Sequence, residues 1–279
     1  MKLLFDQLSF EASKKVTATY STSFYGAVRI LSPTIQPAIH SIYGFVRFAD
    51  EIVDSFQGYK QEDLLNNFEQ DYLQALEEDI SLNPIIHSFV QTLKRYDIDL
   101  KLVDAFLYSM RMDLTKKDYQ SREEYEKYIY GSADVVGLMC LKIFVNGDQE
   151  EYERLKPFAM KLGSAFQKVN FLRDLKSDQE ILERSYFPNV DLKNLSNEDK
   201  TQIIEEIEYD FEQAYKGIIE LPVAAKFGVY VAYVFYKQLL CKLKKVPSNE
   251  ILDKRVRVND PTKLLLLAKS YLDIKFNFV

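Results

Sequence analysis

The sequence has little of what zinc sites, disulfide frameworks or histidine-based catalysis require. It contains two histidines and two cysteines in 279 residues. Zinc usually takes several Cys or His ligands, whereas His40 and His87 have no close partners in the chain, so we assign both to structural roles. Cys140 and Cys241 lie far apart in the sequence, which is typical of reduced thiols in a cytosolic protein. We therefore expect neither a zinc site nor a disulfide.

An excess of basic residues and a long apolar run are missing as well. The 36 basic and 42 acidic residues give a net charge of −6, which argues against a nucleic-acid partner because phosphate backbones need a basic face. No segment reaches the ~20 apolar residues of a membrane span. The first fifteen residues include Asp6 and Glu11 and do not read as a signal peptide. These features predict a cytoplasmic protein.

Glycine and proline are scarce, with nine and eight residues, while apolar residues make up 47% of the chain. Few backbone breaks and a large apolar share favour long helices around a sizeable core. Apolar periodicity and capping residues predict one all-α domain over residues 1–279, a helical bundle around a central apolar cavity. The expected helices cover residues 9–31, 33–57, 62–80, 84–96, 99–115, 121–145, 148–182, 196–217, 222–246 and 260–272. Asn146-Gly147 is interpreted as a helix stop.

One predicted helix carries an apolar face with a polar stripe beside it. The apolar face consists of Ile39, Ile42, Val46, Ala49, Val53 and Phe56. The neighbouring stripe consists of Tyr43, Arg47, Asp50 and Asp54. Because residues three and four apart share one helical face, two carboxylates and a guanidinium should flank the surface that packs into the core.

A second predicted helix carries a similar stripe. Gln167, Asn170, Asp174 and Asp178 follow one another at spacings of three and four, and Arg173 stands beside Asp174. Amide and carboxylate oxygens are hard ligands of the kind that magnesium prefers, and arginine suits phosphate oxygens. The stripe therefore indicates a place for a metal ion and a phosphate group.

Neither aspartate pair is specific by itself. With 42 acids in the chain, random placement gives roughly six acid pairs at this spacing, and either pair alone is typical of a solvated helix face. Two such pairs facing one another inside a helical protein would repel unless divalent cations bridged them. Together they suggest a diphosphate at the rim of an apolar cavity, with a hydrocarbon tail inside.

Five blocks of the sequence resemble the squalene/phytoene synthase family of head-to-head prenyl-condensing enzymes. They are Ser21–Tyr25 (STSFY), Tyr43–Asp54 (YGFVRFADEIVD), Tyr130–Met139 (YGSADVVGLM), Gln167–Asp178 (QKVNFLRDLKSD) and Arg184–Pro188 (RSYFP). The tail from Arg255 to Val258, followed by KLLLLAK, is also similar. The chain departs from the family pattern at Glu51, at Lys176-Ser177 and at Asp134.

The resemblance implies roles for individual residues. Asp50, Asp54, Asp174 and Asp178, helped by Asn170, would bind two or three magnesium ions that bridge to the substrate. The residues that would contact substrate are Ser21, Ser23, Arg47, Gln167, Asn170, Arg173, Tyr186 and Arg255. Tyr43 and Tyr130 would face the cationic intermediate. From the residues alone, ion pairing for the arginines, turn formation for the serines and core packing for the tyrosines stay open.

The resemblance further implies condensation of two geranylgeranyl diphosphates to phytoene through a cyclopropyl diphosphate. Two farnesyl diphosphates giving squalene or dehydrosqualene are the alternative, and a non-catalytic isoprenoid-binding protein is an alternative of another class. A head-to-tail prenyltransferase or terpene cyclase would more often show DDxxD or NSE-type motifs. We do not expect NADPH, because no glycine-rich dinucleotide fingerprint follows a strand. The insoluble product leaves room for a peripheral membrane contact, and the oligomeric state stays open.

Overall fold

The computed structural model is all-helical over the residues that it describes. These are residues 1–180, 184–188, 190, 195–251 and 255–276, and of residues 177–180 only the backbone is described. The helices are α1 (Lys2–Tyr20), α2 (Thr22–Val28), α3 (Gln36–Ser55), α4 (Gln61–Glu78), α5 (Pro84–Tyr96), α6 (Leu100–Thr115), α7 (Arg122–Ile129), α8 (Val135–Phe144), α9 (Gln149–Glu180), α10 (Asn197–Ile218), α11 (Val223–Lys245) and α12 (Asp260–Lys275). A π-helical turn, η1 (Tyr130–Asp134), joins α7 to α8, and a short 3₁₀ turn, η3 (Ser248–Glu250), follows α11. The all-α prediction is confirmed.

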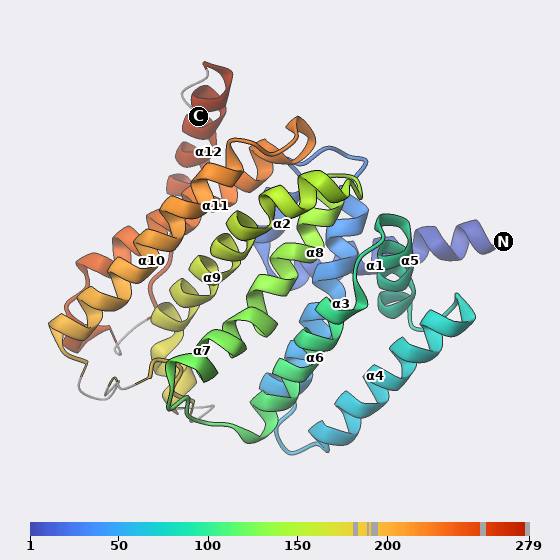
Figure 1. The fold of residues 1–279 in the computed structure, drawn as a ribbon, viewed down its shortest axis with the longest axis horizontal. Helices are drawn as coiled ribbons and strands as arrows, with labels where there is room; N and C mark the ends of the chain where they lie inside the picture. Colours follow the sequence, from blue (N-terminus) through green and yellow to red (C-terminus); the bar gives the residue numbers. More distant parts are fainter. Residues whose placement is uncertain (181–183, 189, 191–194, 252–254, 277–279) are drawn as a thin grey trace.

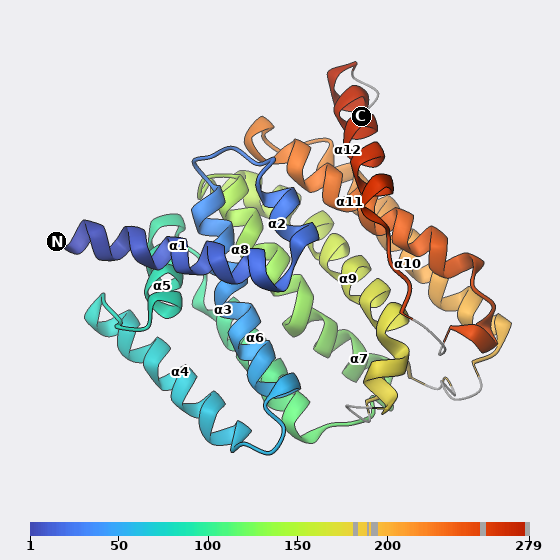
Figure 2. The ribbon, with the colours of Figure 1, turned by 180° about the vertical axis from the view of Figure 1, so that it is seen from behind.

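The helices form a bundle with α3, α8 and α9 in its middle. Helices α6, α8, α9 and α10 pack side by side in that order, as Figure 1 shows. Seen from behind, α1, α2 and α3 lie across this row, and α12 extends from the body on the outside of α11 (Figure 2). Among the described residues, no helix combines the length and the apolar character that crossing a bilayer requires.

Most of the predicted apolar face packs into the core: Ile39, Ile42, Ala49 and Val53 are buried, whereas Val46 lines the cavity and Phe56 is 38% exposed. Phe45 is fully buried, and its ring stacks on that of Phe89 from α5 at 3.9 Å between centroids. Close ring stacking of this kind contributes beyond the burial of apolar area alone. The inner side of α3 is thereby held, which fixes the direction in which its neighbouring polar stripe points.

The predicted helix boundaries need four corrections. The first helix begins at Lys2 and not at residue 9. The expected helix over 9–31 is two helices, because Ser21 adopts an extended backbone and its Oγ accepts a hydrogen bond from Phe24 N as the N-cap of α2. The helix expected from residue 33 begins at Gln36. The helix expected over 121–145 is interrupted by η1. Asn146-Gly147 does end a helix, and both residues have positive φ.

Candidate functional site

A cavity of about 540 Å³ lies between α2, α3, α8, α9, α10 and α11. Its polar end is formed by Ser21, Tyr43, Arg47, Gln167, Asn170, Arg173 and Arg255. Its apolar end is formed by Cys140, Phe144, Leu155 and Phe158. The two polar stripes of the sequence therefore contribute residues to one cavity, from helices that approach it from different sides.

Helix α9 lines the cavity over most of its length. Its lining residues are Leu155, Phe158, Ala159, Leu162, Gly163, Phe166, Gln167, Asn170 and Arg173. These positions are three or four apart or adjacent, so they form one helical face. From Leu155 to Arg173 this face rises about 27 Å at about 1.5 Å per residue. The cavity is therefore long, apolar at one end and polar at the other.

Close helix packing shapes one side of this cavity. A Cβ on Gly163 would lie 2.9 Å from the carbonyl oxygen of Ala133, and one on Gly137 would lie 3.2 Å from that of Ala159. Glycine at these places allows α8 and η1 to approach α9. The pairing also shows that α8 runs antiparallel to α9, which places Cys140 toward the level of Leu155.

Aromatic rings line the polar half of the cavity. Phe24 stacks on Tyr43 at 4.9 Å, and Phe166 stacks on Tyr236 at 3.9 Å. The Tyr236 hydroxyl donates to Oδ1 of Asn170 at 3.3 Å. Gln167 donates to Oγ of Ser132 at 3.3 Å. These contacts hold both amide side chains in the cavity wall.

The α3 stripe is an ion-pair cluster. Arg47 donates to Asp50 Oδ2 at 2.7 Å and also to Glu51, and its guanidinium lies 4.6 Å from the centre of the Tyr20 ring. Burial away from water, and to a smaller extent repulsion from Asp54, raises the pKa of Asp50 to about 7, although the charge of Arg47 opposes the change. Glu51, one of the departures from the family pattern, supplies Arg47 with a second carboxylate.

The α9 stripe pairs with the tail of the chain. Asp174 Oδ1 accepts from Arg173 Nε at 2.9 Å and lies 2.7 Å from Arg255 Nε. Both arginines line the cavity, so Asp174 stands at its polar end. Asp178 belongs to α9 by its backbone, but its side chain lies outside the described residues.

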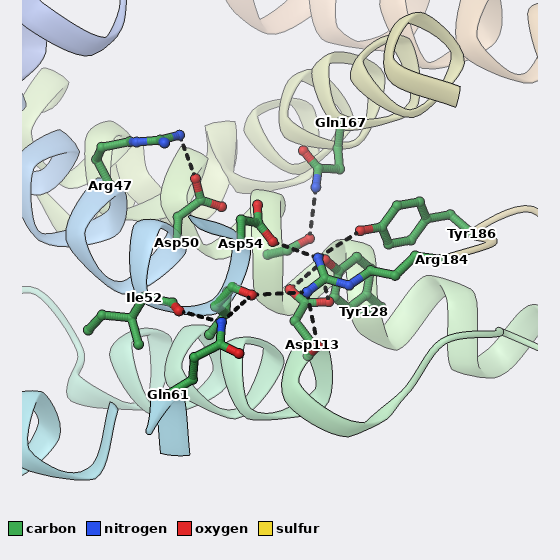
Figure 3. A network of polar contacts seen from close by, with 12 residues as sticks. Arg47, Asp50, Ile52, Asp54, Gln61, Asp113, Tyr128, Gln167, Arg184 and Tyr186 are labelled. Atoms are coloured by element: carbon green, nitrogen blue, oxygen red, sulfur yellow. Dashed lines mark hydrogen bonds and ion pairs between the residues drawn. The ribbon is translucent and has the colours of Figure 1, made fainter. Parts of the chain in front are cut away.

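A buried arginine that the sequence did not single out lies behind Asp54 (Figure 3). Arg184 Nη1 is 2.7 Å from Asp54 Oδ1 and 3.8 Å from Asp113 Oδ1. Backbone bonds between Ser185 and the 117–119 segment hold Arg184 against the end of α6. Burial raises the pKa of Asp113 to about 7 against the opposing charge of Arg184. Arg184 begins the RSYFP block, whereas Asp113 has no local signal.

Ser23, Tyr130 and Tyr186 are not among the cavity-lining residues, and neither are the described metal candidates Asp50, Asp54 and Asp174. Ser23 is exposed. Tyr130 is 37% exposed at the start of η1, whose later residues Ser132 and Ala133 line the cavity instead. Tyr186 is buried, with its ring stacked on Phe171 at 4.0 Å, and its hydroxyl accepts from Arg184 at 3.4 Å.

Asp134 and Tyr128, also from this region, point elsewhere than into the cavity. Asp134 is absent from the lining residues, and its Oδ1 accepts from Ser164 Oγ at 2.8 Å. The acid in the glycine-like position therefore does not disturb the apolar wall. Tyr128 is buried and donates to Asp113 Oδ2 at 2.8 Å. It joins the network behind Asp54 and was missed because nothing in the sequence distinguishes it from its neighbours.

The carboxylates at the polar end of the cavity are suited to binding divalent cations. Within the described side chains, no three or more His, Cys, Asp or Glu residues come together as a complete metal-holding set. Asp50 and Asp54, however, repel one another, and a cation would relieve that repulsion. Magnesium often takes one or two carboxylates and completes its ligands with water and phosphate oxygens. Asp50, Asp54 and Asp174 are the described carboxylates suited to such binding.

Comparison with known proteins identifies relatives along nearly the whole chain. The family model described as "Squalene/phytoene synthase" matches residues 17–262. A 15-cis-phytoene synthase from Synechocystis is 29% identical over 95% of this chain and 85% of its own length. Phytoene synthase 2 from Solanum lycopersicum is 28% identical over 94% of this chain and 90% of its own length.

Solved structures share the fold. A dehydrosqualene synthase in complex with ligand matches with a TM-score of 0.85 at 21% identity, covering 97% of this chain and 98% of the other. A squalene synthase from Alicyclobacillus acidocaldarius matches with a TM-score of 0.73 at 19% identity, covering 86% and 94%.

Proposed function

Because this chain belongs to the squalene/phytoene synthase family, whose members join prenyl diphosphates head to head, we propose that it condenses two geranylgeranyl diphosphates to phytoene. The products would be one forty-carbon hydrocarbon and two diphosphates. The observation that carries this proposal is the single α9 face that runs from Arg173 at the polar end of the cavity to Leu155 at its apolar end.

The length of that face is sufficient for the longer substrate. The sixteen-carbon main chain of a geranylgeranyl group spans roughly 20 Å when its carbon–carbon bonds of about 1.5 Å are extended. The face of about 27 Å along α9 accommodates that length with the diphosphate at the arginines. The similarity to phytoene synthases along more than nine-tenths of the chain points the same way.

The residues at the polar end would bind and polarise the diphosphates. Arg47, Arg173 and Arg255 offer guanidinium groups that suit phosphate oxygens. Asp50, Asp54, Asp174 and Asp178, with Asn170, would hold magnesium, which supplies charge neutralisation for the departing diphosphate. Ser21 and Gln167 would hydrogen-bond to substrate from opposite walls. The contacts with substrate or cation expected of Ser23, Tyr130 and Tyr186 stay predictions, because none of the three residues lines the cavity.

The remainder of the cavity would protect a carbocation. Loss of diphosphate from one substrate leaves an allylic cation, which the double bond of the second substrate attacks. Loss of a proton closes a cyclopropyl ring, and a second ionisation, rearrangement and proton loss give the linear product. Rings such as Tyr43 and Phe166 exclude water and stabilise positive charge, by ~0.5–2 kcal/mol for each suitable face.

We assign phytoene ahead of squalene because the relatives that match along most of the chain are phytoene synthases. The phytoene route as written consumes no NADPH. A dehydrosqualene synthase activity on two farnesyl diphosphates is the second candidate, favoured by the high structural similarity to a protein of that name. This second candidate differs from the phytoene synthase activity in how much of the cavity the shorter substrate chain would fill.

The deciding experiment is product analysis by mass. The protein is given fifteen- and twenty-carbon diphosphates separately, with magnesium, in the presence and absence of NADPH. We expect phytoene from the twenty-carbon substrate regardless of NADPH. A thirty-carbon product alone would favour the second candidate. Binding of isoprenoid that needs no magnesium and releases no diphosphate would instead favour a binding protein.

We also propose that α12 meets an anionic membrane surface, where an insoluble hydrocarbon can leave. Leu264 and Leu265 are each 69% exposed, and Leu272 is 50% exposed, although α12 packs on α11. Exposed Lys269 and Lys275 stand beside them, which suits the phosphates of anionic lipids. Helix α11, on which α12 packs, itself lines the cavity.

A further inference from the structure

Arg184 is a buried cation shared between two carboxylates from different helices. Its side chain is 5% exposed, and Nη1 lies 2.7 Å from Asp54 Oδ1 on α3 and 3.8 Å from Asp113 Oδ1 on α6 (Figure 3). Nη2 donates to the main-chain oxygen of Asp113 at 2.9 Å. Nη2 also donates to the main-chain oxygen of Val53 on α3, at a longer 3.5 Å. The shorter backbone bond of the guanidinium is therefore to α6, while Nη1 makes its short contact with α3.

One carboxylate oxygen of Asp113, Oδ1, lies near this guanidinium and accepts no hydrogen bond from any described residue. Its side chain is 3% exposed, and Oδ2 accepts the hydrogen bond from the Tyr128 hydroxyl at 2.8 Å. Oδ1 has no hydrogen-bond partner among the described residues. Buried polar atoms without partners are uncommon and costly, so an unpartnered oxygen beside a buried arginine calls for an explanation.

The explanation follows from what happens at Asp54 when a cation arrives. In the proposed function, on which the inference rests, Asp54 binds a divalent cation. A guanidinium and a divalent cation on the same carboxylate repel one another, so the pair with Arg184 must weaken. A buried arginine without a carboxylate partner would strongly destabilise the folded protein. A second carboxylate within reach avoids this cost.

We propose that Arg184 exchanges carboxylate partners, from Asp54 to Asp113, when Asp54 takes up a divalent cation. Asp113 is then a positioning residue, which never touches substrate but lowers the free energy needed to free Asp54. The movement is small, because shortening 3.8 Å to a charged hydrogen bond of about 2.8 Å requires about 1 Å. The Nη2 bond to the α6 backbone can persist throughout as the pivot.

The exchange predicts opposite effects on cation affinity for substitutions at Asp113 and at Arg184. Asp113→Asn removes the alternative partner and should hold Arg184 on Asp54, so cation affinity falls. Removing Arg184 as well eliminates the competitor and should restore the affinity. A purely structural role for Asp113 predicts that the double variant is at least as impaired as the single one.

The test is a titration of the full-length protein with Mn²⁺ in the presence of inorganic pyrophosphate, in which free Mn²⁺ is followed by electron paramagnetic resonance. We expect Asp113→Asn to bind Mn²⁺ about tenfold more weakly than wild type, and Asp113→Asn/Arg184→Gln to return to within about twofold of wild type. Melting curves of the same samples establish that each variant is folded.

Asp210→Asn is the matched control. Asp210 on α10 is as buried as Asp113, and its carboxylate is held by Lys161 and Lys168, away from the cavity lining. Its loss should lower stability without changing Mn²⁺ affinity. Should Asp113→Asn not fold, Arg184→Gln alone decides, because it removes the competitor and should bind Mn²⁺ at least as tightly as wild type.

Several outcomes would overturn the exchange. Wild-type affinity in Asp113→Asn, or a double variant as weak as the single one, would show that Asp113 does not govern the cation. Asp54→Asn separates this failure from a failure of the proposed function. If Asp54→Asn loses Mn²⁺ binding while Asp113→Asn keeps it, the metal role of Asp54 is supported and the exchange is wrong. If the wild-type protein binds no Mn²⁺ with pyrophosphate, both the exchange and the proposed metal binding are wrong.

Discussion

Arg255 Nε lies 2.7 Å from Asp174 Oδ1, so an arginine near the end of the chain closes onto the second aspartate stripe. The contact is made from beyond η3, on the segment that leads into α12. It gives the polar end of the cavity a third arginine, after Arg47 and Arg173, and it leaves Arg255 half-exposed at the mouth.

Arg255→Ala should weaken substrate binding more than it weakens the chemical step. Hydrogen bonds to charged groups contribute about 1.5–3 kcal/mol, so we expect KM for the prenyl diphosphate to rise about tenfold or more. Steady-state kinetics check this, with Arg257→Ala as control, because Arg257 is exposed on the same segment and does not line the cavity. Equal KM values for the two variants would contradict a diphosphate contact at Arg255.

Asp50→Asn should abolish turnover and yet stabilise the metal-free protein at alkaline pH. The folded pKa of about 7 exceeds the ordinary 3.8, so the folded state holds a proton that the unfolded chain releases, and stability falls as pH rises from about 4 to 7. Asparagine cannot ionise, and Arg47 keeps Glu51 as its partner.

The gain at pH 8 should be modest because the Asp50 side chain is 35% exposed and solvent screens its charge. We expect about 1 kcal/mol, which corresponds to roughly 2–4 °C in melting temperature. Melting curves in a chelator at pH 4 and pH 8 measure it. A variant that melts below wild type at pH 8, or one that retains turnover, contradicts the assignment.

Cys140→Phe should shift substrate preference from twenty to fifteen carbons. Cys140 lines the apolar end of the cavity, remote from Arg173, so a ring there would fill the space needed by the end of the longer chain. We expect the ratio of kcat/KM values for the two substrates to change by about tenfold or more. Cys241→Phe is the control, since Cys241 is exposed on α11. An unchanged ratio would mean that the chain end lies elsewhere.

Gly131→Ala should destabilise the fold, whereas Gly26→Ala should not. A Cβ on Gly131 would lie 1.9 Å from Ser109 Oγ and 2.7 Å from the carbonyl oxygen of Ala105, while one on Gly26 meets nothing within 4 Å. Overpacking of this kind costs about 1–3 kcal/mol, whereas alanine in an open helical position gains about 0.5–1 kcal/mol. Thermal melting compares them. Equal melting temperatures would mean that η1 can move away from α6 at little cost.

Leu265→Glu/Leu272→Glu should reduce binding to vesicles that contain phosphatidylglycerol. Burying a leucine contributes about 1.5–3 kcal/mol, so loss of two should lower sedimentation with the vesicles by at least tenfold. Leu82→Glu is the control, because Leu82 is 91% exposed in the turn before α5. If all three proteins sediment alike, α12 is not the membrane-facing element.

Local patterns predicted much of this protein correctly. The all-α class and the family are confirmed. Arg47 from the first stripe and Asn170 from the second line one cavity, whereas the described aspartates of both stripes are not among its lining residues. Helical spacing is a property of the chain itself, so residues three and four apart share a face wherever the helix lies. The metal and substrate roles of these residues stay predictions until the experiments above are done.

The errors have local causes too. The helix expected over residues 9–31 runs through Ser21, but a serine is also a good cap, and the extended backbone at Ser21 ends α1. The π-helical turn at η1 changes the direction of side chains after Tyr130, which no apolar periodicity reveals. Tyr130 is 37% exposed, whereas Ser132 and Ala133 within the turn line the cavity.

The sequence by itself determined the helices, their apolar faces and the two stripes, because these depend on spacings within a single turn or two. Only the tertiary structure decided that Arg184 meets Asp54 and Asp113, which come from three different segments. Such a meeting depends on how α3, α6 and the chain after α9 pack together, and the free energy of that packing is shared among contacts distant in the sequence. No short stretch of residues carries it.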